Sequence, residues 1–328
     1  MFLSIVIPVH NAAPYLGNCL DSIWAQGIPE DDYEVICVDD CSTDAVKDCF
    51  DKQNSRSNFR YLTNTENLRA GGSRNRGVKA AKGEYIVFID ADDYYHPESL
   101  MKAYQYQKQN GLDLLVCDMS REPYGGPAST QMILQYKDQS ICSGREFLLK
   151  NGFPGGPTKY FFKRSLMVDN NVWFEEKVAC EDPDWAWRLP YYARRMQYQP
   201  ILLHHYVIYP NSSVRREFKN PKATYDRMFC GKRLWELSNL YDRSEELHSV
   251  KYISGETFTV ALRSMCALFD SPRTKAEVIE RNIPPKVDYG FLVRFARRCP
   301  LLFGLLSTIF SPVTLLLLIA KRRLSRVK

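Results

Sequence analysis

The chain has 328 residues, of which 45% are hydrophobic and 25% charged, and this ordinary globular composition excludes a disordered, collagen-like or polytopic membrane protein. The net charge of +6 comes from the C-terminus, because residues 294–328 hold eight basic and no acidic side chains, against 36 basic and 38 acidic elsewhere. This distribution argues against a nucleic-acid partner and predicts a basic tail that meets an anionic surface.

The ten cysteines form no Cys-x-x-Cys pair and no Cys/His cluster with zinc spacing. Most lie within apolar runs, where cysteine is a small core residue. Residues 1–8 lack the basic start and the long apolar run of a signal peptide. The sequence therefore predicts reduced thiols in a cytosolic compartment.

Short apolar runs alternate with helical spacings over the first third of the chain. The expected strands are residues 3–8, 34–39, 59–62, 84–90 and 112–117, and the expected helices are 13–26, 43–50, 70–81 and 97–109. Unbroken apolar strands between helices predict an α/β fold, with a mainly parallel sheet flanked by helices on both faces.

The pattern changes after residue 125. Residues 125–156 are rich in Gly, Pro and Ser, with one short helix near 145–150. Further strands are expected at 160–162 and 201–209, and further helices at 181–192, 221–240 and 246–269. The predicted organisation is a catalytic domain over 1–214, a helical C-terminal extension over 215–293 and a membrane-associated tail over 294–328.

Acidic residues follow the strand expected at 84–90. In such sheets ligands bind beyond the carboxyl ends of the strands, and Asp90 and Asp92 there could share a divalent cation, Mn²⁺ or Mg²⁺, with a diphosphate. The alternative is a solvated acidic turn in which Asp93 caps the next helix.

Asp40 follows the strand expected at 34–39 and could accept a hydrogen bond from a ring N–H of a base such as uracil. Ser42, Thr43 and Asp44 are predicted to cap the helix that starts there.

Paired glycines, Gly71 and Gly72, allow the backbone to approach a ligand closely. The segment is neither GxGxxG nor a P-loop, so dehydrogenase and NTPase functions lose their main support. The alternative is a helix start with arginines on its solvent face.

Glu181, Asp182 and Asp184 begin a helix beside two tryptophans. A carboxylate in such surroundings could serve as a general base. Taken alone, this segment is explained more simply as ordinary first-turn acids, which the helix dipole favours.

In order and spacing these four segments resemble the catalytic domain of glycosyltransferase family 2, which has the GT-A fold, of the bacterial surface-polysaccharide type. The resemblance covers residues 4 to about 214. It rests on residues 4–11 (SIVIPVHN), 38–44 (VDDCSTD), 67–86, 90–93 (DADD, the DXD element) and 181–182 (ED).

The resemblance implies a role for each matching residue. Pro8, His10 and Asp40 would line the nucleotide base pocket. Asp92 would bind the metal directly, and Asp182 would be the base that deprotonates the acceptor hydroxyl. The other donor-binding positions would be Asn67, Gly71, Arg74, Asp90 and Ala91, and the acceptor positions Glu181 and Trp185, with Trp187 sharing the aromatic platform.

One of two adjacent histidines, His204 or His205, is a candidate for a further metal or diphosphate contact. Neighbouring residues on a strand face opposite ways, so at most one is expected to serve. The alternative is a packed or surface histidine.

The sequence departs from the family pattern at three places. His10 replaces an aromatic residue, and Cys41 replaces a glycine, which suggests a less strained backbone. The later Tyr-Arg segment lacks its arginine after Tyr209, so neutralising the diphosphate is expected to fall to other groups such as Arg215 or Arg216.

Residues 300–320 contain no charge and are flanked by Arg297–Arg298 and by three basic residues, 321–323. A helix of this length would match one hydrocarbon core. Positive charge on both flanks and Pro312 favour a re-entrant or in-plane anchor on an anionic, cytoplasmic membrane face. The alternative is a buried core helix.

The sequence thus predicts an inverting, metal-dependent glycosyltransferase at the cytoplasmic face of the cell membrane. It would move a sugar from a nucleotide-sugar, UDP-linked, to a glycan or lipid-linked acceptor. One alternative is a nucleotidyltransferase, which would release pyrophosphate and leave Asp182 without a role. The other is a catalytically silent glycan- or nucleotide-binding scaffold.

Overall fold

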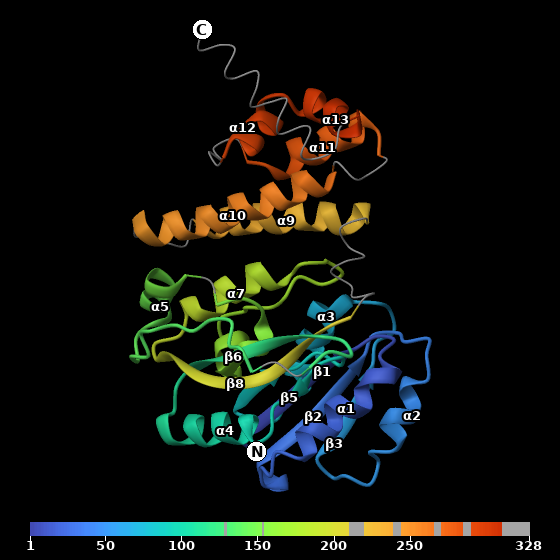
Figure 1. Cartoon of the computed structure of the whole chain (residues 1–328), viewed down its shortest axis with the longest axis vertical. Helices are drawn as coiled ribbons and strands as arrows, with labels where there is room; N and C mark the ends of the chain where they lie inside the picture. The colour runs from blue at the N-terminus through green and yellow to red at the C-terminus, as the bar shows by residue number, and fades with distance from the viewer. Residues whose placement is uncertain are drawn as a thin grey trace. The chain divides into compact units, whose positions relative to one another are not determined.

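The chain divides into two compact units, Met1–Tyr209 and Pro210–Lys328. The computed structural model, drawn in Figure 1, describes residues 1–127, 130–152, 154–209, 220–238, 244–265, 270–284 and 290–309. The boundary expected at residue 214 lies outside these ranges. Each unit has its own hydrophobic core.

The first unit is built on a sheet of eight strands. They are β1 (Leu3–Val9), β2 (Tyr33–Asp39), β3 (Phe59–Thr63), β4 (Tyr85–Phe88), β5 (Tyr94–Tyr95), β6 (Leu114–Pro123), β7 (Tyr160–Lys163) and β8 (Met196–Ile208). Their order in the sheet is β3-β2-β1-β4-β7-β6-β8-β5.

The strand directions correct the expected sheet. Strands β3, β2, β1 and β4 are parallel, as are β6 and β8. However, β7 runs antiparallel to both of its neighbours, and β5 runs antiparallel to β8. The α/β fold is confirmed, but the sheet is mixed rather than mainly parallel, because an apolar run carries no information about the direction of its strand.

Helices cover both faces of this sheet (Figure 1). One core joins alternate strand residues such as Ile5 and Val35 to α1 (Ala13–Trp24), α2 (Val46–Asp51) and α4 (Ser99–Asn110). The other joins Val6 and Ile36 to α3 (Arg69–Ala80), α5 (Gly144–Asn151), α6 (Arg164–Val168) and α7 (Asp182–Tyr191). The period of two along each strand thus divides its side chains between two helical layers.

Helix α3 packs unusually closely on the sheet. A Cβ atom at Gly77 would lie 2.2 Å from Cγ1 of Val6 on β1, so no other residue fits there without movement. This close packing fixes the helix that carries Arg74 against the strand that ends beside His10.

The second unit is helical. It contains α9 (Pro221–Leu237), α10 (Ser244–Met265), α11 (Pro272–Asn282), α12 (Phe291–Arg298) and α13 (Pro300–Ile309). Met228, Phe258 and Ile279 share one core with Ala296 and Phe303. Residues 294–309, expected to start a separate tail, therefore pack with the helical extension.

Helix α13 buries Phe303 and exposes four large apolar side chains, with relative exposures between 37% and 64% for Leu301, Leu302, Leu305 and Ile309. Within the described ranges, no helix has both the length and the apolar character needed to cross a membrane. Residues 310–320 of the apolar segment lie outside those ranges.

Candidate active site

Asp40 follows β2 and is held by the protein through one carboxylate oxygen. Its Oδ1 accepts hydrogen bonds from the backbone N–H of Leu68 and from Nδ2 of Asn64, each at 2.7 Å. Its Oδ2 accepts no hydrogen bond from the described part of the chain. The residue is 3% exposed, so its geometry is fixed while one oxygen stays free for a ligand.

The other residues expected in the base pocket lie around Asp40. Nδ1 of His10 is 2.7 Å from the carbonyl oxygen of Asp40, and Nδ2 of Asn67 donates to the same oxygen at 3.3 Å. Pro8 pairs with Val38 at the same end of β1 and β2. The fold therefore brings Pro8, His10, Asp40 and Asn67 together.

The turn after Asp40 corrects the expectation for Cys41. Cys41 has φ of +60°, so the left-handed backbone is kept although a glycine is not. Asp44 accepts from the backbone N–H of Ala13 through Oδ2 and from that of Val46, the first residue of α2, through Oδ1, so it contacts the starts of both α1 and α2. At Ala45, the N-cap of α2, there is no side-chain hydrogen bond.

The acidic segment follows β4. Oδ1 of Asp90 binds Nη2 of Arg74 at 2.7 Å. Burial, followed by the negative charge of Asp90, raises the pKa of Asp92 to about 6. Asp93 is buried and its Oδ1 accepts from the backbone N–H of Val207, so it anchors β8 and does not cap α4.

Arg74 connects three carboxylates. In addition to Asp90, its Nη1 lies 2.9 Å from Oε1 of Glu181 and 3.2 Å from Oδ1 of Asp182. Burial acts to lower the pKa of Arg74, but Asp90, Asp182 and Glu181 outweigh it and raise that pKa. The arginine, with its side chain 4% exposed, therefore joins the donor segment to the Glu181–Asp182 pair.

Glu181 and Asp182 stand at the start of α7. Burial and the charge of Asp182 raise the pKa of Glu181 to about 8, with Arg74 opposing the rise. Burial also raises the pKa of Asp182, against the effect of Arg74. The side chain of Asp182 is 38% exposed and that of Glu181 only 9%, so Asp182 is the one accessible to a substrate.

Close packing requires a glycine at position 71, and the sequence does not reveal this requirement. A Cβ atom there would lie 2.8 Å from the carbonyl oxygen of Glu175 and 2.9 Å from Cγ of Glu181. The close approach that the glycine allows is therefore to the segment leading into Glu181. Ala91 is 5% exposed and lies in the core beneath the acidic turn.

The aromatic platform predicted for the acceptor is wrong. Trp185 is fully buried, stacks on Phe174 at 4.4 Å between ring centroids, and donates from Nε1 to the carbonyl oxygen of Val172. Trp187 is 1% exposed. Both tryptophans are buried, although residues two apart do not share a helix face, and only Trp185 belongs to the core between α7 and the sheet.

The histidine expectation is not supported by the geometry. His204 is fully buried, and its nearest acidic atom is Oδ2 of Asp93, 3.9 Å from Nε2. His205 instead contacts Glu122 at 3.1 Å and stacks on the ring of Tyr94. No group of three or more His, Cys, Asp or Glu side chains in the described ranges is placed to hold a metal.

A divalent cation nevertheless fits Asp92. Asp90 already binds Arg74. The pKa of Asp92 is raised because its negative charge is unfavourable in these surroundings, and a bound cation would offset that charge. Mg²⁺ is often held by one or two carboxylates with substrate phosphates supplying the remaining oxygens. This manner of binding matches a site where the protein supplies one carboxylate better than a site where protein side chains supply every ligand.

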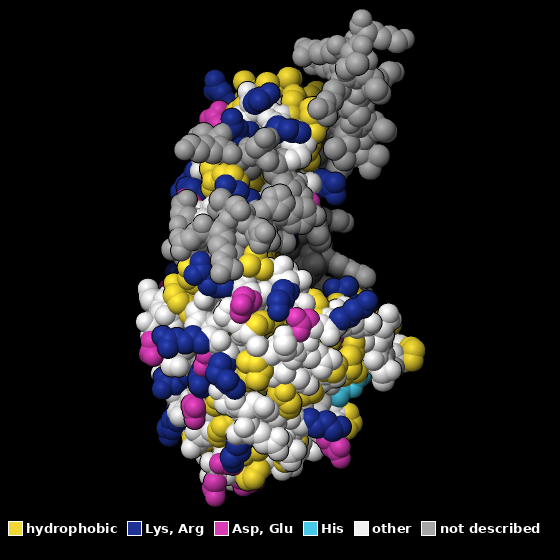
Figure 2. Space-filling view, turned by 90° about the vertical axis from the view of Figure 1, so that its left-hand side faces the viewer, with side chains coloured by type: hydrophobic (Ala, Val, Ile, Leu, Met, Phe, Trp, Pro, Cys, Tyr) yellow, Lys and Arg dark blue, Asp and Glu magenta, His cyan; other side chains and the backbone are white. Residues whose placement is uncertain are grey.

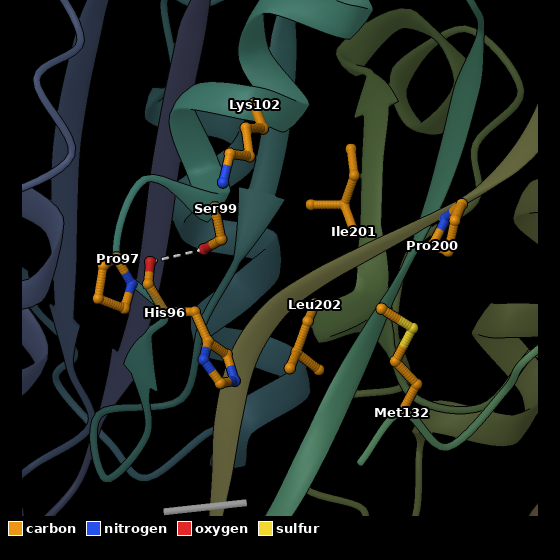
Figure 3. A pocket seen from close by; sticks show the side chains of 8 residues that line it. All are labelled: His96, Pro97, Ser99, Lys102, Met132, Pro200, Ile201 and Leu202. Atoms are coloured by element: carbon orange, nitrogen blue, oxygen red, sulfur yellow. Dashed lines mark hydrogen bonds between the residues drawn. The ribbon is translucent and has the colours of Figure 1, made fainter. Parts of the chain in front are cut away.

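A cavity of about 310 Å³ lies elsewhere in the first unit (Figure 3). It is lined by the start of α4 and the middle of β8, where Ser99 donates to the carbonyl oxygen of His96 at 2.8 Å. Its lining is His96, Pro97, Ser99, Lys102, Met132, Pro200, Ile201 and Leu202. None of the residues predicted to bind the donor or acceptor belongs to it.

One residue that sequence reasoning missed is Lys159, which is 3% exposed and acts electrostatically on Asp182. A lysine in a strand-leading segment gives no signal of burial. Arg215 and Arg216, proposed to neutralise the diphosphate, lie outside the described residues.

A sheet whose strands present acidic groups at one edge, covered by helices on both faces, is the architecture of the GT-A fold. The family model "Glycosyl transferase family 2" matches residues 4–175, more than half of the chain. The chain therefore belongs to glycosyltransferase family 2, a family of enzymes. Glu181 and Asp182 lie just beyond the matched range.

Among known proteins, the chain is 36% identical over 185 residues to the poly(ribitol-phosphate) beta-glucosyltransferase of Bacillus spizizenii. That alignment covers 56% of this chain but only 28% of the relative, so the chain spans less than a third of that protein's length.

Two solved structures share the fold. The crystal structure of S. aureus TarS 1-349 in complex with UDP-GlcNAc has a TM-score of 0.60 at 18% identity, covering 94% of this chain and 90% of that one. The mannosyltransferase PcManGT of Pyrobaculum calidifontis, with GDP-Man and Mn²⁺, has a TM-score of 0.55 at 15% identity, covering 94% and 87%.

Proposed function

We propose that this protein transfers a sugar, with inversion, from a UDP-sugar to a glycan or lipid-linked acceptor in cell-surface polysaccharide synthesis. The observation that carries the proposal is the Arg74 cluster, which holds Asp90 of the donor segment and Asp182 of α7 on one guanidinium. Donor and acceptor groups would thus meet at one edge of the sheet.

Asp182 is the proposed general base. Its carboxylate takes the proton of the acceptor hydroxyl while that oxygen forms a bond to the anomeric carbon. The bond from this carbon to the diphosphate oxygen breaks, and the nucleoside diphosphate leaves with the electron pair. A raised pKa strengthens the carboxylate as a proton acceptor, and Arg74 keeps it oriented.

On the donor side, Asp40 would accept the ring N–H of uracil through its free Oδ2, with His10 beside the base. Asp92 would hold the divalent cation, Mn²⁺ or Mg²⁺, whose charge offsets that of the diphosphate. Because Arg74 already binds Asp90, the protein leaves Asp92 as the ligand for that ion.

The names of similar proteins support this choice of substrates. The Bacillus relative is named for a poly(ribitol-phosphate) acceptor, and the TarS structure holds UDP-GlcNAc. A nucleotidyltransferase would need no base at Asp182, and the family match favours sugar transfer instead.

The test is to incubate the purified chain with a panel of nucleotide-sugars and Mn²⁺ or Mg²⁺. We expect nucleoside diphosphate release from a UDP-sugar, dependent on the divalent cation. Release of pyrophosphate would instead support the nucleotidyltransferase, and the absence of release with every donor would support a silent binding scaffold.

We also propose that the second unit lies on an anionic membrane surface at the cytoplasmic face. Figure 2 shows hydrophobic side chains exposed beside Lys and Arg on that unit. The exposed face of α13 carries Leu301 and Leu305, and Arg297 and Arg298 precede it. Apolar side chains beside basic ones are what interfacial helices present to anionic lipids.

Vesicle sedimentation tests this location. The full chain should pellet with phosphatidylglycerol vesicles and not with phosphatidylcholine vesicles. The double variant Leu301→Glu/Leu305→Glu should stay in the supernatant, whereas Val168→Glu, an exposed apolar position of the first unit, should behave as wild type. Equal pelleting of both variants would place the contact elsewhere.

A further inference from the structure

Lys159 is a buried cation. It ends the short 3-10 helix η2 (Pro157–Lys159), directly before β7, and is 3% exposed. It forms no hydrogen bond or ion pair with any residue in the described part of the chain. A buried charge is costly unless it is paired, so this position needs an explanation.

The backbone around Lys159 is shaped to leave room for its amino group. Gly155 has φ of +94°, and a Cβ atom there would lie 2.6 Å from Nζ of Lys159. A Cβ atom at the next residue, Gly156, would lie 3.4 Å from Oδ2 of Asp182. The two glycines therefore line both the ammonium group and the carboxylate of the proposed base.

The charges nearby indicate what could bind there. Burial lowers the pKa of Lys159 to about 8, with Asp182 and Asp118 opposing this effect and Arg121 adding to it. Because that pKa lies above 7, the ammonium form still predominates at neutral pH.

Asp118 is not free to act as the counter-ion. Its carboxylate accepts hydrogen bonds from the backbone N–H groups of Ile133 and Leu134 and from the hydroxyl of Tyr198. Asp182 is held by Arg74. An anion from outside the protein would complete the pairing of Lys159.

We propose that Lys159 binds a phosphate group of a substrate on the Asp182 side of the site. This rests on the proposed function, which supplies two phosphate sources: the diphosphate of the donor, or a phosphate within the acceptor. The three protons of an ammonium group suit the oxygens of either one. Lys159 is then a substrate-binding residue that the family motifs do not include.

The test measures the two phosphate sources separately by calorimetry, on the full chain. In one arm UDP is titrated in the presence of Mn²⁺, and in the other ribitol 5-phosphate is titrated into UDP-saturated protein. The variants are Lys159→Met and Lys159→Arg. Lys163→Met is the matched control, because Lys163 lies four residues further on and already pairs with Asp113 at 3.0 Å.

We expect Lys159→Met to weaken one of the two affinities by about tenfold or more. Lys159→Arg should retain most of that affinity, and Lys163→Met should match wild type. Loss in the UDP arm identifies the donor diphosphate, and loss in the ribitol phosphate arm identifies the acceptor. Should Lys159→Met not fold, as judged by circular dichroism, Lys159→Gln replaces it.

Wild-type affinity of the charge-neutral variant in both arms would overturn the proposal. The outcome differs from failure of the proposed function, in which the wild-type chain itself would bind no UDP.

Discussion

Asp40 follows β2 and Asp92 follows β4, the strands on either side of β1, yet the surroundings of the two carboxylates differ. Asp40 receives two hydrogen bonds of 2.7 Å on one oxygen. Asp92 lies beside Asp90, and burial together with that neighbour raises its pKa to about 6. One oxygen of Asp40 is thus hydrogen-bonded before a ligand binds, whereas the negative charges of Asp90 and Asp92 disfavour each other.

At the catalytic end three carboxylates share one guanidinium group. Arg74 binds Asp90, Glu181 and Asp182, while Asp40 is held by two uncharged donors from the connection between β3 and α3. Preorganised charge of this kind favours catalysis at a cost in stability. Substitutions at the catalytic end should therefore affect activity together with stability.

The largest expected effect is on turnover. Asp182→Asn should lower the transfer rate by about 10²–10⁴-fold, because the general base is lost. Affinity for the donor should stay within about twofold, since the base contacts the acceptor. Glu181→Gln should cost less, and Asp169→Asn, an exposed carboxylate, should cost nothing. Near-normal transfer by Asp182→Asn, measured by UDP release, would shift the base to Glu181 or Asp184.

Arg74→Met should lower the free energy of unfolding by about 3 kcal/mol, because it leaves three carboxylates without their cation. Activity should fall too, as Asp182 loses its orientation. Lys79→Met is the control on the same helix, because its side chain lies over the ring of Trp173 and forms no ion pair with the residues that the structure describes. Urea denaturation measures the free energy of unfolding of both variants. Equal values would contradict the prediction that Arg74 stabilises the three carboxylates.

The pH dependence of stability should reveal the stored charge at Asp92. Its folded pKa of about 6 exceeds the unfolded value near 4, so the folded state binds more protons between these values. The free energy of unfolding should therefore fall as the pH rises from about 4 to 6.

Asp92→Asn removes this titration. The variant should be more stable than wild type at pH 7 by about 1 kcal/mol, while losing cation-dependent donor binding. Denaturation curves at pH 4, 5, 6 and 7 test both statements. An Asp92→Asn variant less stable than wild type at pH 7 would mean that the fold does not disfavour the negative charge of Asp92.

The smallest expected effect lies on the base-binding side. Cys41 has φ of +60°, a conformation that costs a side-chain residue about 1 kcal/mol and glycine almost nothing. Cys41→Gly should raise the free energy of unfolding by up to about this amount. Cys41→Ala keeps the unfavourable backbone and should give no gain. A gain for alanine equal to that for glycine would attribute the effect to the thiol instead.

Much of the first unit was predictable because its strands are buried on both faces and read as unbroken apolar runs. The ends of α3 and α4 fall within two residues of those expected. Direction was not predictable, so β7 was not expected to be antiparallel. Nor were helices α11 and α12 expected from the sequence, because their buried apolar residues are defined only by packing around Phe258 and Phe303.

The site divides in a similar way. Acidic residues at strand ends, such as Asp40 and Asp92, could be located because their position in the chain fixes their edge of the sheet. Burial of Trp185 and the links made by Arg74 depend on how α7 rotates onto the sheet. Neither that rotation nor the burial of Lys159 leaves a local pattern in the sequence.

The configuration of the first sugar product tests the central claim most directly. The purified chain is mixed with UDP-GlcNAc and Mn²⁺, and the sugar released to water is followed by time-resolved proton NMR before its anomers equilibrate. Inversion at the anomeric carbon of this α-linked donor predicts that the β anomer appears first, and much more slowly with Asp182→Asn. Initial release of the α anomer, or a rate unaffected by Asp182→Asn, would contradict single displacement with Asp182 as the base.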